Sequence, residues 1–240
     1  MINLSAYKRP ALQFSGGKDS LACLYLLREQ LDHITVYWLD TGDTFPETRA
    51  VIDSVRGWIP HFEVIQSDVA AWRQEFGHPS DLVPAKAHAL GVMYGMNDFR
   101  LVSRFDCCWH NIMAPMSRRM KADGVDAVVR GTKLADTGVV PAEGPTEEGY
   151  DVILPIRDWS HADVHQYLDS VGAPRNRLYE TTRGFSAPEC MGCTAWWDDS
   201  KAEYFRVVRP ELLSDYQAKL RDIRSAIQSH LADLDAELGV

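Results

Sequence analysis

The sequence predicts an α/β fold, a doubly wound and mostly parallel sheet that is followed by a long C-terminal helix. Three observations predict it: short apolar strands alternate with helical segments, a glycine-rich turn follows the first strand, and leucines recur at helical spacing near the C-terminus. Alternation of strands and helices favours parallel pairing, because a crossover helix returns the chain to the same edge of the sheet.

The elements of the N-terminal part follow this alternation. Strands are predicted at residues 11–14, 34–39 and 62–65, where apolar, β-branched and aromatic residues gather. Helices are predicted between them, over residues 21–27 and from Pro46 onward.

The pattern is predicted to continue in the second half of the chain. A helix is expected over residues 113–121, strands over 127–129 and 152–156, and a further helix over 161–170. Ser160 and Asp163 have the spacing of a helix N-terminus. Residues 134–150 carry glycine, proline and acids without periodicity, so we expect a mobile surface loop there.

Apolar residues near the C-terminus are spaced three or four apart. They are Leu213, Tyr216, Leu220, Ile223, Ile227, Leu231, Leu234 and Leu238. This nearly heptad seam predicts a long amphipathic helix that packs on its own domain, with a homodimeric helix pair as the alternative. We therefore expect a main domain over residues 1–195 and a C-terminal helical segment over residues 196–240.

The composition excludes several classes of protein. The 240 residues are 45% hydrophobic and 25% charged, which excludes disordered and low-complexity chains. No apolar run is long enough for a membrane helix and the N-terminus lacks the apolar core of a secretory signal, so we expect a cytoplasmic protein without membrane contact. The net charge of −9 argues against bulk electrostatic binding of nucleic acid, although residues 99–133 hold seven basic residues against three aspartates.

A strand-to-helix turn of glycine and polar residues is the clearest functional motif. Its residues are Ser15, Gly16, Gly17, Lys18, Asp19 and Ser20. Glycines let the backbone point its N–H groups inward, the helix N-terminus adds partial positive charge, and the lysine and serine side chains can donate to phosphate oxygens. Asp19 suits a Mg²⁺ ion that bridges to phosphate. The spacing is not that of Walker A, and a plain tight turn is the alternative.

Two further residues are predicted at the same edge of the sheet. Asp40 stands at the carboxyl end of the second strand, where such sheets bind ligands, and it either positions the ligand or caps the following helix. Lys133 follows the strand at 127–129, and it either meets a phosphate as a point charge or lies in solvent.

Four of the five cysteines form two close pairs. Cys107 and Cys108 are adjacent, and Cys190 and Cys193 form a CxxC turn with a glycine inside. Four thiolates suit Zn²⁺ or an iron–sulfur cluster. Because adjacent cysteines diverge, we favour a cluster with separated irons over a single ion; buried free cysteines are the third possibility. Cys23 lies at an apolar helix position and is expected in the core.

Several motifs resemble a known enzyme family, in the family's order. The turn SGGKDS at residues 15–20 resembles the PP-loop of the adenine nucleotide alpha-hydrolase superfamily of ATP pyrophosphatases. The segments DTG at 40–42 and FPET at 45–48 are similar to signatures of the phosphoadenosine phosphosulfate (PAPS) reductase family. The CC…CxxC pattern, with Thr194 after its last cysteine, resembles the [4Fe–4S] arrangement of adenylylsulfate (APS) reductases.

This resemblance implies a nucleotide-binding domain with an iron–sulfur site, catalytic roles for Lys18, Asp19 and Lys133, and ATP, PAPS or APS as the nucleotide. Two departures favour ATP. No cysteine follows Cys193 where the family's reductases carry a nucleophilic C-terminal thiol, and the turn keeps the Lys–Asp pair found in members that cleave ATP. We therefore expect cleavage of ATP at the α-phosphate, with release of pyrophosphate, for sulfur transfer to a nucleic acid or a small molecule.

Two alternative functions remain open at this point. The chain would be a PAPS or APS reductase if a thiol of a partner protein or a small molecule supplied the missing nucleophile. It would be a non-catalytic module if it only bound the nucleotide and the cluster.

Overall fold

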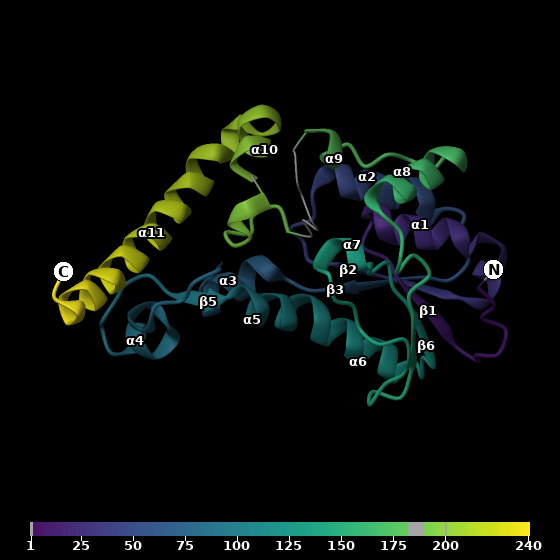
Figure 1. Cartoon of the computed structure of the whole chain (residues 1–240), viewed down its shortest axis with the longest axis horizontal. Helices are drawn as coiled ribbons and strands as arrows, with labels where there is room; N and C mark the ends of the chain where they lie inside the picture. Colours follow the sequence, from purple (N-terminus) through teal and green to yellow (C-terminus); the bar gives the residue numbers. More distant parts are fainter. Residues whose placement is uncertain (1, 182–189, 200) are drawn as a thin grey trace. The chain divides into compact units, whose positions relative to one another are not determined.

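The structure is a computed structural model that describes residues 2–181, 190–199 and 201–240 (Figure 1). Its contacts divide the chain into two compact units, which we call the sheet unit and the cysteine unit. The sheet unit comprises Met1–Asp40, Thr44–Ser67 and Ala114–Leu178. The cysteine unit comprises Thr41–Asp43, Asp68–Met113 and Tyr179–Val240.

The sheet unit is built on one sheet with the strand order β3-β2-β1-β6-β8-β7. The strands are β1 (Pro10–Gln13), β2 (Thr35–Asp40), β3 (Phe62–Gln66), β6 (Ala127–Val129), β7 (Gly144–Pro145) and β8 (Asp151–Ile153). Neighbouring strands pair in parallel except β7 with β8, and Ala11 of β1 is in register with Thr35 on one side and Val128 on the other. The predicted mostly parallel sheet is confirmed.

The segment 134–150, expected as a loop, is partly regular. It contains a short helix, α7 (Leu134–Thr137), and the edge strand β7. The strand forms because its backbone pairs with β8, and the Glu143 carboxylate next to it accepts a hydrogen bond from Leu154 N at 3.0 Å. The sequence pattern of residues 134–150 does not encode this pairing with the edge strand β8, which explains why the segment was expected to be a loop.

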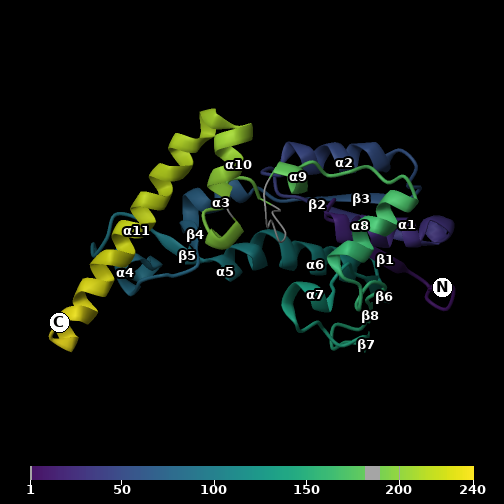
Figure 2. The same cartoon turned by 45° about the horizontal axis from the view of Figure 1, so that its top comes forward.

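Helices cover both faces of this sheet, as the doubly wound prediction requires (Figure 2). Helices α1 (Lys18–Leu26), α2 (Pro46–Arg56) and α8 (His161–Ser170) bury their apolar side chains in one core with Leu12 and Val36. Helix α6 (Ala114–Ala122) lies on the other face, where Tyr37 OH donates to the Asp123 carboxylate at 2.7 Å and Gln13 donates to the Met120 sulfur at 3.6 Å.

Strand β1 is the point at which the strand order reverses. Its neighbours β2 and β6 lead to opposite edges of the sheet, so the carboxyl ends of β1 and β6 flank a topological switch point. Sheets of this class bind ligands in the crevice at such a point. The chain places residues 14–20 and 130–133 there, directly after these two strands.

The cysteine unit has a small parallel sheet and several helices. Its strands are β4 (His78–Ser80) and β5 (Leu101–Ser103), and its helices include α3 (Val69–Phe76), α4 (Ala89–Met93), α5 (Arg104–Cys108), α10 (Lys201–Val208) and α11 (Pro210–Leu238). Helix α9 (Leu178–Thr181) begins with the last residue of the sheet unit and continues with residues of the cysteine unit. Helix α11 shares a core with residues 83–101 of this unit, and the domain boundary expected at residue 195 stays a prediction.

Helix α11 is the predicted long amphipathic helix, and it runs for 29 residues. Ile223 is 1% exposed and shares a core with Leu101 and Ala87, so the first part of the seam packs on its own unit. The last part is open, since Leu231 and Leu234 are 50% and 53% exposed. The homodimeric pair stays a prediction. Across the described residues, none of the helices combines the length and the hydrophobicity needed to cross a membrane.

Replacement of Ile223 by alanine should lower the free energy of unfolding by about 2–4 kcal/mol, because it leaves a cavity under α11. Replacement of the exposed Leu234 on the same helix by alanine should change the free energy of unfolding by less than about 0.5 kcal/mol. Urea unfolding of the full chain, followed by circular dichroism, measures both. Equal effects of the two substitutions would contradict the packing described here.

Candidate nucleotide site and cysteine centre

The turn after β1 requires glycine at position 16 for two reasons. Gly16 has φ +75°, and a Cβ there would lie 2.8 Å from Cγ1 of Ile52. Gly17 is the N-cap of α1, and within the described residues no side chain caps that helix end. A helix N-terminus without a side-chain cap offers N–H groups and partial positive charge to an anion.

The two serines of the turn hold it closed. Ser20 Oγ donates to Gly17 O at 3.0 Å and accepts from Ser15 N at 3.2 Å, while the two hydroxyl oxygens are 3.1 Å apart. Each hydroxyl has one hydrogen, so these bonds commit the Ser20 hydrogen to the backbone. Donation by Ser20 to a phosphate would require its hydroxyl to leave Gly17 O, and it stays a prediction.

Lys133 is completely buried beside the turn, which argues against the solvent-exposed alternative. Its Nζ lies 3.0 Å from one carboxylate oxygen of Asp19 and 2.5 Å from a carboxylate oxygen of Asp136. The other carboxylate oxygen of Asp19 lies 2.8 Å from Lys18 Nζ. Both oxygens of Asp19 thus face ammonium groups, and the structure gives no support for the predicted Mg²⁺ at this carboxylate.

Gly131 brings Lys133 to the turn, a role that the sequence did not reveal. A Cβ at Gly131 would lie 2.7 Å from the carbonyl carbon of Asp19 and 2.8 Å from Ser20 N, so only glycine lets this strand end touch the first turn of α1. Asn176 was also missed: it is 7% exposed and donates to Thr48 Oγ1 at 3.0 Å and to Gly16 O at 3.4 Å.

Asp40 lies at the end of β2 as predicted, but its partner is a side chain of the next helix. Its carboxylate is 2.6 Å from the guanidinium of Arg49, which also stacks 4.5 Å from the centre of the Trp38 ring. Helix α2 begins at Pro46 and its N-cap residue Phe45 supplies no side-chain cap, and the capping role considered for Asp40 stays a prediction. Its predicted contact with a nucleotide stays a prediction.

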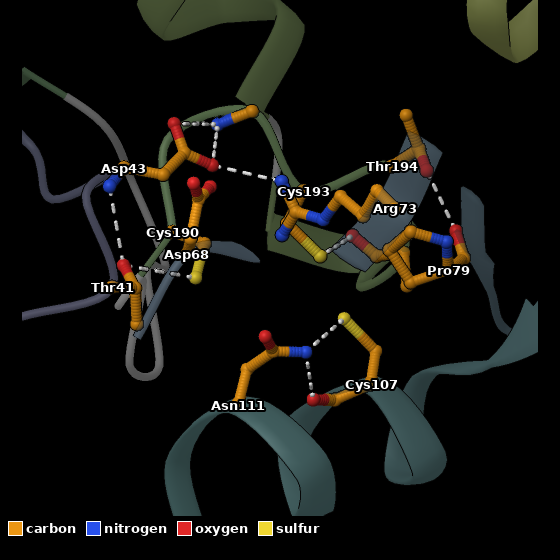
Figure 3. A network of polar contacts seen from close by, with 12 residues as sticks. Thr41, Asp43, Asp68, Arg73, Pro79, Cys107, Asn111, Cys190, Cys193 and Thr194 are labelled. Atoms are coloured by element: carbon orange, nitrogen blue, oxygen red, sulfur yellow. Dashed lines mark hydrogen bonds and ion pairs between the residues drawn. The ribbon is translucent and has the colours of Figure 1, made fainter. Parts of the chain in front are cut away.

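The cysteine unit brings three of the four paired cysteines together (Figure 3). Cys107, Cys190 and Cys193 are 4%, 9% and 8% exposed and share one buried cluster. Cys108 is partly exposed, because successive side chains of a helix point about 100° apart. A π-helical turn, Trp109–Met113, follows α5 and brings Asn111 back to donate to Cys107 O at 3.0 Å.

The CxxC turn is fixed by Asp43, which sequence reasoning did not single out. The Asp43 carboxylate accepts from Gly192 N at 3.0 and 3.1 Å, and its carbonyl accepts from Met191 N at 2.7 Å. A Cβ on Gly192 would lie 3.1 Å from that carboxylate, which explains the glycine inside the motif. The signal was present in the sequence, since Asp43 directly follows the DTG segment that we assigned to the nucleotide.

Burial and one cation set the electrostatics of this centre. Burial raises the pKa of the Cys190 thiol to about 12 and also raises the pKa of Cys107, while the Arg73 guanidinium lowers both. Burial alone would lower the pKa of Arg73, but the neighbouring cysteines and Asp43 together hold that pKa above its ordinary value. Arg73 offsets only part of the effect of burial, so the pKa values of Cys190 and Cys107 stay above that of a free thiol.

The donor set is a group of three buried thiols, with Cys108 next in the chain to one of them. Among the described residues, no three Cys, His, Asp or Glu side chains are arranged to hold a metal ion. Thiolates are ligands of both zinc and iron–sulfur clusters. The choice between a cluster and a single zinc ion therefore stays a prediction.

Comparisons with known proteins agree with the fold. A family model for the phosphoadenosine phosphosulfate reductase domain matches residues 9–196. An adenosine 5'-phosphosulfate reductase from Rhizobium meliloti (strain 1021) is 26% identical over 218 residues, covering 83% of this chain and 75% of that protein. A phosphoadenosine 5'-phosphosulfate reductase from Yersinia pseudotuberculosis (serotype O:1b, strain IP 31758) is 26% identical over 195 residues, covering 80% and 73%.

One solved structure has a similar fold. It is a phosphoadenylyl-sulfate reductase from Candida auris in a phosphate complex, with a TM-score of 0.51 and 18% sequence identity. The likeness covers 73% of this chain and 79% of that one.

Replacement of Gly131 by alanine should lower the free energy of unfolding by about 1–3 kcal/mol, because the new methyl group overlaps the backbone of Asp19. Gly57, which ends α2 with φ −67° and has open space around it, is the matched control. Alanine at Gly57 should leave the stability unchanged or raise it by up to about 1 kcal/mol. Urea unfolding curves of the two variants should move in different directions; a common shift would contradict the close approach.

Proposed function

The chain belongs to the phosphoadenosine phosphosulfate reductase domain family, and we propose that it is a sulfur-transfer enzyme that cleaves ATP at the α-phosphate. The observation that carries this proposal is the pair of buried lysines, Lys18 and Lys133, on either side of Asp19 at the uncapped start of α1. Two cations beside a helix N-terminus are suited to a strongly charged phosphate tail.

In the proposed reaction, an oxygen of the acceptor attacks the α-phosphorus of ATP. The bond to the bridging oxygen breaks, pyrophosphate leaves with that electron pair, and the acceptor's proton passes to water. Lys18 and the N–H groups of α1 would hold the leaving pyrophosphate, and Lys133 would stabilise charge on the α-phosphate. A sulfide equivalent then displaces AMP from the adenylylated acceptor.

We further propose a [4Fe–4S] cluster held by Cys107, Cys108, Cys190 and Cys193. The three buried thiols and the neighbouring Arg73 support it, and Cys108 directly follows Cys107 in the chain. When bound, such a cluster would supply a thiolate-bound iron site near which a sulfur atom can be held. The protein itself would contribute a water-poor pocket, because three of the four thiols are less than a tenth exposed.

Reduction of a sulfonucleotide is the second candidate, and the names of the relatives favour it. In that reaction a thiolate attacks the sulfur of PAPS or APS and the sulfur–oxygen bond to the nucleotide breaks. A second thiol then releases sulfite while a disulfide forms, so an external dithiol such as thioredoxin, or two glutathiones, would balance the electrons.

The cluster-loaded full chain should convert ATP to AMP and pyrophosphate when acceptors are supplied, under anaerobic conditions. Replacement of Lys133 by methionine should lower this rate by about 10²–10³-fold, because it removes a buried charge aimed at the α-phosphate. Lys8, which is exposed on the N-terminal segment, is the control, and its methionine variant should keep the full rate. Sulfite release from PAPS or APS with thioredoxin, without pyrophosphate from ATP, would overturn the assignment.

The anaerobically reconstituted chain should bind about four irons and four sulfides. Replacement of Cys193 by serine should reduce the iron content and the visible absorbance strongly, because it removes a ligand. Cys23 is fully buried in the core of the sheet unit, and its alanine variant should load like the wild type. Equal iron loss in both variants, or stoichiometric zinc in place of iron, would contradict the proposed cluster.

A further inference from the structure

The Asp43–Arg73 ion pair lies inside the cysteine centre but is not part of the proposed ligand set. Arg73, on α3, is only 9% exposed, and its NH1 lies 2.8 Å from the Asp43 carboxylate. The same carboxylate accepts both contacts from Gly192 N. Figure 3 shows Arg73 between this carboxylate and the thiols. A buried ion pair of this kind is costly to form, so it calls for a physical explanation.

The guanidinium faces the sulfur atoms as well as the carboxylate. Its charge interacts with Cys107, Cys190 and Cys193, and it lowers the pKa of Cys107 and of Cys190 against the effect of burial. Within the described residues, its buried Nε has no hydrogen-bond partner. An arginine carries five N–H donors in a fixed fork, so donors remain for sulfur after Asp43 has been bound.

We propose that Arg73 balances the negative charge of the bound cluster and thereby governs how firmly the cluster is retained, while Asp43 offsets part of the charge of Arg73. This inference rests on the proposed cluster. Four thiolates outweigh the positive charge of an iron–sulfur core, so the loaded centre is a buried anion. Such an anion needs a nearby cation, because water is largely excluded there.

A purely structural role predicts a different outcome at Asp43. If the pair only fixed the CxxC turn, replacing Asp43 by asparagine would weaken the turn and speed cluster loss. Asparagine keeps a side-chain oxygen for Gly192 N but removes the negative charge. The charge-balance role predicts that cluster loss then becomes slower, because the charge of Arg73 is no longer offset.

The test measures iron release from the anaerobically reconstituted full chain to a ferrous chelator. The variants are Arg73→Met, Arg73→Lys and Asp43→Asn. Arg104→Met is the control, because Arg104 is an arginine of the same unit that pairs with Asp81 and stacks 3.9 Å from the Trp196 ring. Arg73→Met should release iron at least about tenfold faster than the wild type. Arg73→Lys should stay close to the wild type, Asp43→Asn should be slower, and Arg104→Met unchanged.

Each result decides the matter. Release from Arg73→Met at the wild-type rate, or faster release from Asp43→Asn, overturns the proposal. If Arg73→Met folds by circular dichroism but takes up no iron while Arg73→Lys does, the need for charge is supported. If neither takes up iron although both fold, the shape of the guanidinium matters and the charge proposal fails. If the wild type and Arg104→Met also take up no iron, the proposed cluster itself is refuted, and the role proposed for Arg73 falls with it.

Discussion

Each candidate site depends on a buried cation whose charge is balanced by aspartates from the same unit. Lys133 is completely buried between Asp19 and Asp136, and Arg73 is nearly buried against Asp43. A buried charge without a partner is so unfavourable that these pairs must form whenever the unit folds. They therefore tie together segments that are distant in the sequence and fix the geometry of the groups around them.

The glycines of the two sites follow from the same constraint. Gly131 and Gly192 stand where a Cβ would lie 2.7 Å from the backbone of Asp19 and 3.1 Å from the carboxylate of Asp43. In both places an aspartate that binds the buried cation also lies against a glycine of the opposite segment. At each site the close approach of the glycine and the ion pair of the aspartate therefore depend on each other. A side chain at the glycine would displace the aspartate, and loss of the aspartate would leave the buried cation without its partner.

Much of the sheet unit could be predicted from sequence, because its signals are local. Strand β6 was predicted at its observed residues, and Ser160 and Asp163 form the expected capping box. The remainder depends on contacts between distant segments. No periodic pattern or motif indicates the partners of Asp40 and Lys133. The same is true of the hydrogen bonds from the CxxC turn to Asp43 and of the position of Arg73. Tertiary packing alone brings them together, and no single sequence records it.

Charge balance at the glycine turn also bears on which nucleotide it suits. Without a ligand, the two ammonium groups of Lys18 and Lys133 are matched by the carboxylates of Asp19 and Asp136. An anion that binds there competes with Asp19 for both lysines, so it must offer them more charge than the carboxylate does. The triphosphate tail of ATP carries more negative charge than the phosphosulfate of APS or PAPS. If the turn binds the nucleotide as we propose, lysines that are already paired internally would favour the more highly charged tail, which supports ATP in the proposed reaction.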